Sequence, residues 1–78
     1  MAKHNPDTAR IFEENMKGCA ALEEKEFQDK INVTVLAVEH DDSYSTKERL
    51  KIYSLLTSLS NCAEKERVKF ANKVKKLL

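Results

Sequence analysis

Apolar residues recur through the first half of the chain at the spacing of an α-helix. Asn5 and Pro6 are residue types that favour an N-cap and the first helical position. The residues that follow them on one stripe of a helical wheel are Ala9, Phe12, Met16, Cys19, Ala20, Phe27, Ile31, Val35 and Val38. Because this stripe keeps its phase, the pattern predicts one long helix over residues 6–39.

The segment INVTVLAV, residues 31–38, has a second interpretation. Its β-branched residues are stiff in helices and favoured in strands. Ile31, Val33 and Val35 alternate with the polar Asn32 and Thr34, as in a strand with one wet face. A strand needs a partner, and no other segment of this chain reads as one. The alternative is therefore an α+β fold in which residues 31–38 pair as a strand across a dimer.

Two further helices are predicted after the polar run EHDDSYS, residues 39–45. Ser45 and Glu48 have the spacing of a capping box, and apolar residues follow at helical spacing up to Leu59. The sequence SLSNC, residues 58–62, interrupts this pattern before a third periodic segment. We therefore predict helices over residues 46–59 and 62–78. They form a hairpin packed on the long first helix in an all-α fold.

The two hairpin helices begin with similar hexapeptides, KERLKI at Lys47 and KERVKF at Lys65. We interpret the likeness as shared helix-start chemistry. The apolar residue after each arginine, Leu50 or Val68, points away from the main apolar stripe of its helix. We expect both side chains to be partly exposed, where they cover the first helix or contact a partner.

Length and composition limit the class of protein. The chain has 78 residues, with 41% hydrophobic and 35% charged residues, one Gly and one Pro. Few turn-forming residues favour helices over many strands, and this length predicts a single small domain, residues 1–78. No stretch is apolar enough to span a membrane or to serve as a signal peptide. We therefore expect a cytoplasmic protein, not associated with membranes, whose Cys19 and Cys62 are reduced.

The net charge of +1 hides an asymmetry along the chain. Residues 1–44 contain 5 Lys/Arg and 10 Asp/Glu, whereas residues 45–78 contain 9 Lys/Arg and 3 Asp/Glu. The basic stripe of the last helix consists of Lys65, Lys69, Lys73 and Lys76. Such a stripe can follow a phosphate backbone, so the alternative function is a small nucleic-acid-binding regulator. A charged outer face is, however, the usual state of an amphipathic helix.

Catalytic and metal chemistry find little support in the sequence. The candidate soft ligands His4, Cys19, His40 and Cys62 do not fall at zinc-ligand spacings. Gly18 is the one glycine, which excludes a glycine-rich phosphate loop. Cys62 lies near a predicted helix start, a position that lowers a thiol pKa and favours redox sensitivity. We expect no enzymatic activity, no metal and no cofactor.

The remaining class is a small protein that works by binding. The acidic candidates for partner contacts, beside Leu50 and Val68, are Glu13, Glu23, Glu24 and Glu26. An acidic helix face suits a basic groove on a partner or on a second copy. A first helix longer than its two neighbours leaves apolar surface uncovered, so we expect a homodimer. The sequence thus predicts a non-enzymatic regulator, an adaptor or an inhibitor, whose partner is another protein.

Overall fold

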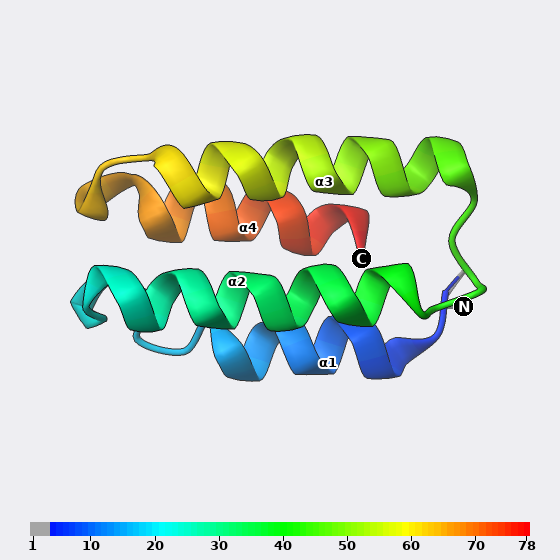
Figure 1. Ribbon diagram of the computed structural model, residues 1–78, viewed down its shortest axis with the longest axis horizontal. Helices are drawn as coiled ribbons and strands as arrows, with labels where there is room; N and C mark the ends of the chain where they lie inside the picture. Colours follow the sequence, from blue (N-terminus) through cyan, green and yellow to red (C-terminus); the bar gives the residue numbers. More distant parts are fainter. Residues whose placement is uncertain (1–3) are drawn as a thin grey trace.

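The computed structural model describes residues 4–78, in which four α-helices are joined by short links (Figure 1). The helices are α1 (Pro6–Asn15), α2 (Glu24–Glu39), α3 (Thr46–Asn61) and α4 (Arg67–Leu77), with the 3₁₀ helices η1 (Cys19–Ala21) and η2 (Glu64–Glu66). Each α-helix lies beside the next, and α4 returns to contact α1. The result is a bundle of 31 × 20 × 20 Å, and the predicted all-α fold is confirmed.

All four helices turn one stripe of apolar side chains toward a shared core. The buried apolar residues are Phe12, Met16, Cys19, Phe27, Ile31, Val38, Tyr44, Ile52, Leu56, Leu59, Ala71 and Val74. Burial of a single large apolar side chain stabilises a fold by about 1.5–3 kcal/mol. The core is therefore the main favourable contribution to folding, and it fixes which side of each helix faces outward.

The long helix predicted over residues 6–39 is wrong, because the chain turns back between α1 and α2. Gly18 has φ 65°, in the left-handed region that favours glycine, and this residue ends the path of α1. Figure 1 shows that α1 and α2 run in opposite directions. Cys19, in the turn, is nevertheless buried in the same core as Phe12 and Phe27. The apolar stripe therefore stays in phase across the break, which hides the break from a helical wheel.

Residues 31–38 are helical, so the strand alternative is also wrong. Ile31, Thr34 and Val38 are buried, whereas Val33 and Leu36 are exposed, as expected for one helical face against a core. The other three helices bury this face, while a lone strand would leave its backbone groups unpaired. Tertiary packing therefore overrides the β propensity of the segment.

The C-terminal hairpin forms close to its predicted bounds. Ser45 Oγ accepts the Glu48 N–H at 3.1 Å, and the Glu48 carboxylate accepts the Ser45 N–H at 2.9 Å, so the predicted capping box is confirmed. Helix α3 continues to Asn61 rather than residue 59, and α4 begins at Arg67 after η2 rather than at residue 62. The hairpin is therefore shifted by a few residues but keeps its antiparallel arrangement.

Arg67, the first residue of α4, is buried at the end of the bundle where both 3₁₀ turns lie. Its Nη1 donates to the carbonyl oxygens of Cys19 and Leu22 at 3.1 and 2.8 Å. The guanidinium lies 3.9 Å above the centre of the Phe27 ring, and Nη2 is 2.9 Å from the Glu24 carboxylate. Arg67 therefore connects the link between α1 and α2 to the start of α4. The sequence did not predict this role, because Arg67 lies among charged residues at the start of a predicted helix.

The substitution Gly18→Ala distinguishes the broken helix from a continuous one. In a continuous helix, alanine would stabilise the protein by about 1 kcal/mol relative to glycine. In the structure a Cβ on Gly18 meets no atom within 4 Å, so the change affects only the left-handed backbone. We expect a loss of about 1 kcal/mol in the free energy of unfolding, measured by urea titration. Gly18→Asn should lose less, and a gain in Gly18→Ala would contradict the break.

The substitution Arg67→Met tests the contacts of the buried guanidinium. Methionine fills much of the volume but removes the donor to the Leu22 carbonyl, whereas the Cys19 carbonyl still accepts the Leu22 N–H at 3.3 Å. We expect the free energy of unfolding to fall by about 3 kcal/mol, because the hydrogen bond to Leu22, the ion pair with Glu24 and the cation–π contact with Phe27 are lost. Urea unfolding measures this loss, and Arg67→Lys should recover part of it. A loss below about 1 kcal/mol would mean that water replaces the guanidinium at these carbonyls.

Candidate interaction surfaces

Exposed leucines border a groove between α2 and α3. Leu36 and Leu50 are 54% and 63% exposed. The groove, of about 260 Å³, is lined by Gln28, Ile31, Asn32, Val35, Tyr53, Leu56, Thr57 and Ser60. Leu36 lies one helical turn after Asn32, and Leu50 lies one helical turn before Tyr53, so each leucine stands beside a residue that lines the groove. The groove is therefore open, with apolar side chains both in its walls and beside it.

This surface carries no charge along most of its length, although 35% of the chain is charged. Residues 31–38 and 52–63 contain no Asp, Glu, Lys or Arg. Ser60 Oγ donates to Gln28 Oε1 at 2.6 Å and Gln28 Nε2 donates to the Ser60 carbonyl at 2.8 Å, which aligns the two uncharged segments side by side. We name this surface the α2–α3 face and define it as four exposed or partly exposed residues of the groove, Asn32, Val35, Tyr53 and Thr57, together with the adjoining Leu36 and Leu50.

The two predicted apolar contact residues are exposed, as expected, but they do not share a site. Leu50 borders the α2–α3 groove, whereas Val68, 53% exposed, lines a shallow groove with Phe12 and Met16 of α1. In a bundle whose helices neighbour one another in chain order, the α2–α3 and α1–α4 grooves lie on opposite sides. The two residues lie on opposite sides because α4 packs against α1. The sequence pattern of a single helix does not predict this packing.

The four acidic candidates are divided between two roles. Glu13 Oε1 accepts from Lys75 Nζ at 2.8 Å, and this hydrogen bond and charge hold the pKa of Glu13 below its usual range. Glu24 accepts from Arg67 and from Gln28 Nε2. Glu23 and Glu26 are exposed near the start of α2. Two of the four side chains therefore pair within the bundle, and all four are exposed.

The predicted basic stripe lies on the outside of the bundle. Its four members, Lys65, Lys69, Lys73 and Lys76, are all exposed. Lys69 Nζ is 3.8 Å from the Glu66 carboxylate, and Lys73 Nζ is 5.0 Å above the centre of the Phe70 ring. The stripe is thus accessible along η2 and α4.

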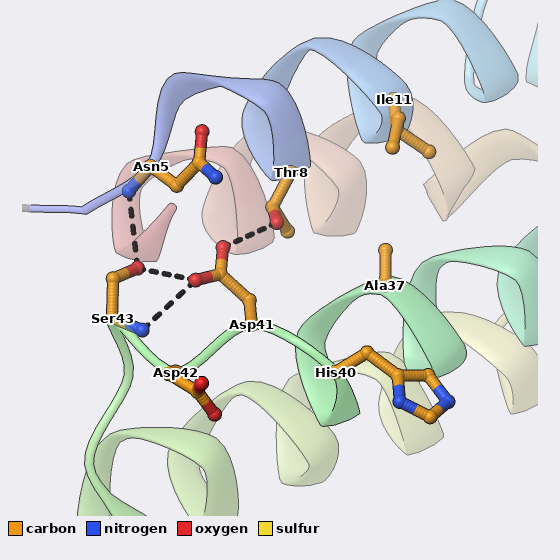
Figure 2. A pocket seen from close by; sticks show the side chains of 8 residues that line it. All are labelled: Asn5, Thr8, Ile11, Ala37, His40, Asp41, Asp42 and Ser43. Atoms are coloured by element: carbon orange, nitrogen blue, oxygen red, sulfur yellow. Dashed lines mark hydrogen bonds between the residues drawn. The ribbon is translucent and has the colours of Figure 1, made fainter.

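An open hollow of about 490 Å³ lies where the start of α1 meets the link between α2 and α3 (Figure 2). At its centre, Asp41 Oδ2 accepts from Thr8 Oγ1 at 2.5 Å. Asp41 Oδ1 accepts from both the N–H and the hydroxyl of Ser43, at 2.9 and 2.6 Å. Ser43 Oγ in turn accepts the Asn5 N–H at 3.0 Å. These bonds join the N-terminal end of α1 to the α2–α3 link.

The Asp41 carboxylate serves as an anchor for the chain rather than as an acid or base for a substrate. Burial opposes its ionisation, but the hydrogen bonds from Ser43 and Thr8 outweigh this, and the pKa of Asp41 is lowered. Both oxygens are already hydrogen-bonded, and Figure 2 shows His40 and Asp42 directed away from them. The hollow therefore gathers polar side chains without presenting a free reactive group at Asp41.

Neither cysteine has the lowered thiol pKa that the sequence predicted for Cys62. Both are free, with Cys19 buried and Cys62 partly buried. Burial raises the pKa of the Cys62 thiol, so the prediction of a lowered value is wrong. The thiol lies at the end of α3, 3.2 Å from the Leu59 carbonyl, instead of at the exposed start of α4. Burial also raises the pKa of Cys19.

Comparison of the chain with protein-family models, curated proteins and solved structures gave no match. Within residues 4–78 there is no group of three or more His, Cys, Asp or Glu side chains placed to hold a metal ion. Across the same residues, the helices are too short or too polar to cross a membrane. A proposal for function therefore rests on the chemistry of the surfaces described above.

The substitution Asp41→Asn tests whether the ionised Asp41 carboxylate stabilises the fold, and its effect should depend on pH. We expect a loss of about 2 kcal/mol at pH 7, because hydrogen bonds to an ionised carboxylate are replaced by weaker ones. The folded-state pKa lies below the ordinary value of 3.8, so this stabilisation is fully present above that value and is lost as the pH falls through the folded-state pKa. The difference between the wild type and the variant should therefore narrow in strong acid.

Urea unfolding at neutral pH and at about pH 2.5 measures both effects. Asp42→Asn is the matched control, because it removes an exposed neighbouring carboxylate outside this hydrogen-bond network. A difference between Asp41→Asn and the wild type that stays constant into acid would contradict the anchoring role of the ionised group.

Proposed function

We propose that this protein is a non-enzymatic adaptor or inhibitor that binds another protein through the α2–α3 face. The observation that carries the proposal is a groove between two uncharged helix segments, beside which Leu36 and Leu50 are 54% and 63% exposed. Contiguous apolar surface on a small protein marks an interaction site more often than isolated apolar residues do. The cores of protein interfaces are likewise depleted of charge.

The shape of the face suits a partner that offers a helix. Two antiparallel helices leave a groove into which the side-chain ridge of a third helix can pack. Val35 and Tyr53 line this groove, and tyrosine is among the residues that contribute most to binding energy. The polar Asn32 and Thr57 line the same groove and can form hydrogen bonds at its margin. Binding would occupy the partner's surface without chemical change.

We also propose that a second copy of the chain can bind the α2–α3 face in competition with the partner protein. The overhanging helix that suggested a homodimer does not exist, because α1 and α2 are separate. The α2–α3 face instead offers both ridges, at Leu36 and Leu50, and a groove, so it can pair with itself about a two-fold axis. Dimerisation and partner binding would then exclude each other. We also propose an intracellular site of action, which the two free cysteines suit.

The double substitution Leu36→Glu with Leu50→Glu should abolish partner binding. A central apolar contact that is replaced by a carboxylate weakens binding by about 2 kcal/mol, or roughly 30-fold, for each hot-spot residue. The control is Val68→Glu, which places one such carboxylate at a similarly exposed residue on the opposite side of the bundle. Both variants should keep the helical circular dichroism spectrum, because all three residues are exposed.

The measurement is a comparison of proteins captured by a photo-crosslinker at residue 32 in cells of the source organism. The proposal expects a discrete protein that is captured by the wild type and by Val68→Glu but not by the double variant. Equilibrium ultracentrifugation of the same three proteins reports self-association through this face. Equal capture by all three proteins would contradict the assignment of the α2–α3 face.

A further inference from the structure

The structure divides the nine basic residues of the C-terminal half into two groups. Three bind within the bundle: Arg49 Nη2 donates to the Asp41 carbonyl at 2.8 Å, Arg67 binds the η1 turn, and Lys75 pairs with Glu13. The remaining six, all exposed, are Lys47, Lys51, Lys65, Lys69, Lys73 and Lys76. The sequence pattern identified only the four on the last helix, because Lys47 and Lys51 belong to a different element.

These six lysines form one surface along α3 and α4, which lie side by side (Figure 1). Lys47 and Lys51 are four residues apart and share a side of α3. Lys51 lines a depression together with Leu77, so its helix side adjoins the C-terminal part of α4. The lysines of η2 and α4 follow at spacings of four, four and three residues, which keeps them on one side. We name this surface the lysine face.

Few carboxylates offset the charge of the lysine face. The acidic residues after Tyr44 are Glu48, Glu64 and Glu66. The Glu48 carboxylate is already used, since it accepts the Ser45 N–H and lies 3.1 Å from the His4 ring nitrogen. Glu66 reaches Lys69 only at 3.8 Å. Six lysines therefore face solvent, and the half of the chain that carries them contains only three carboxylates.

We propose that the lysine face binds the phosphate backbone of duplex nucleic acid without sequence preference. This inference goes beyond the proposed protein-binding function and rests on a different surface. Lysines four residues apart on a helix are separated by about 6 Å along its axis. A duplex offers about one phosphate charge per 1.7 Å of its length, so several phosphates lie within reach of two lysine rows at once.

The composition of the lysine face favours nucleic acid over an acidic protein. Protein interfaces are depleted of lysine and enriched in arginine and aromatic residues, because their centres lose water. All six positions are lysine, a strongly hydrated point charge that suits long-range attraction to phosphates. Bases are read mainly by arginine, asparagine and glutamine, so a lysine surface predicts no sequence preference.

Two further features favour a duplex over a single strand or a membrane. Binding of single strands relies on aromatic side chains that stack with bases, and Phe70 lies partly buried beneath Lys73. Interfacial membrane binding needs a broad apolar face beside the charges. On this side of α4 the exposed large apolar residue is Leu77, at only 36%. The electrostatic attraction to phosphates is therefore the main source of affinity.

The test is the salt dependence of binding to a random-sequence DNA duplex, measured by fluorescence anisotropy. The tested variant is Lys69→Gln, Lys73→Gln and Lys76→Gln together. The matched control is Lys17→Gln, Lys25→Gln and Lys30→Gln, which changes the net charge equally but on α2 and on the link between α1 and α2. Glutamine keeps helix propensity similar to lysine, so both variants should fold.

The wild type should bind with a slope of log K against log salt of about −5, because up to six phosphate contacts form. The triple variant of the lysine face should reduce this slope by about 2.7, whereas the control should change it little. Absence of duplex binding by the wild type at about 20 mM salt would overturn the proposal. Equal slopes in the two variants, or tighter binding to phosphatidylserine vesicles than to DNA, would also overturn it.

The two surfaces can be tested separately. The variant with Leu36→Glu and Leu50→Glu should keep at least part of the salt-dependent DNA binding, because the six lysines are unchanged. Conversely, the lysine variant should still capture the protein partner. If the wild type shows only one of the two activities, the missing activity identifies which of the two proposals has failed.

Discussion

The hydrogen bonds from Arg67 to the Cys19 and Leu22 carbonyls are the constraint on which the bundle depends. A backbone carbonyl that is taken out of water needs a hydrogen-bond donor. The Cys19 carbonyl accepts the Leu22 N–H within the η1 turn and also accepts from Arg67, and the Leu22 carbonyl accepts from Arg67. The charge of Arg67 is offset by the Phe27 ring and by Glu24. The break in the N-terminal half is stable because this side chain, 48 residues away from Cys19, reaches into it.

The repeated Lys-Glu-Arg sequence acquires a structural meaning from this contact. Arg49, the arginine of the first copy, donates to the Asp41 carbonyl at 2.8 Å, just beyond the C-terminal end of α2. Arg67, the arginine of the second copy, holds the turn just before its N-terminal end. The two arginines therefore bracket α2: Arg49 fixes its C-terminal end to α3, and Arg67 fixes its N-terminal end to α4. A groove between two fixed helices is preorganised, which lowers the entropy that a partner must overcome on binding.

Sequence patterns predicted the helical class, the capping box at Ser45 and most of the core, because these depend on local spacing. The break at Gly18 was missed because Cys19 continues the apolar stripe. The burial of Arg67 was missed because the carbonyl oxygens that it binds belong to residues distant in sequence. Exposure of Leu50 and Val68 was predicted correctly, but their assignment to opposite sides requires the closure of α4 on α1. The uncharged runs at residues 31–38 and 52–63 are visible in the sequence. They indicate the α2–α3 face only once the fold places them side by side.

The charge asymmetry of the chain becomes an asymmetry of the folded surface. Pairs of Glu13 with Lys75 and of Glu24 with Arg67 connect the acidic and basic halves within one molecule. The exposed pair of Glu13 and Lys75 contributes little to stability, and the two pairs together use only two of the positive charges. Six lysines held on one face repel one another, which opposes folding and is offset by the core and by Arg67. A surface that lowers stability in this way is better explained by an anionic partner than by the needs of the fold.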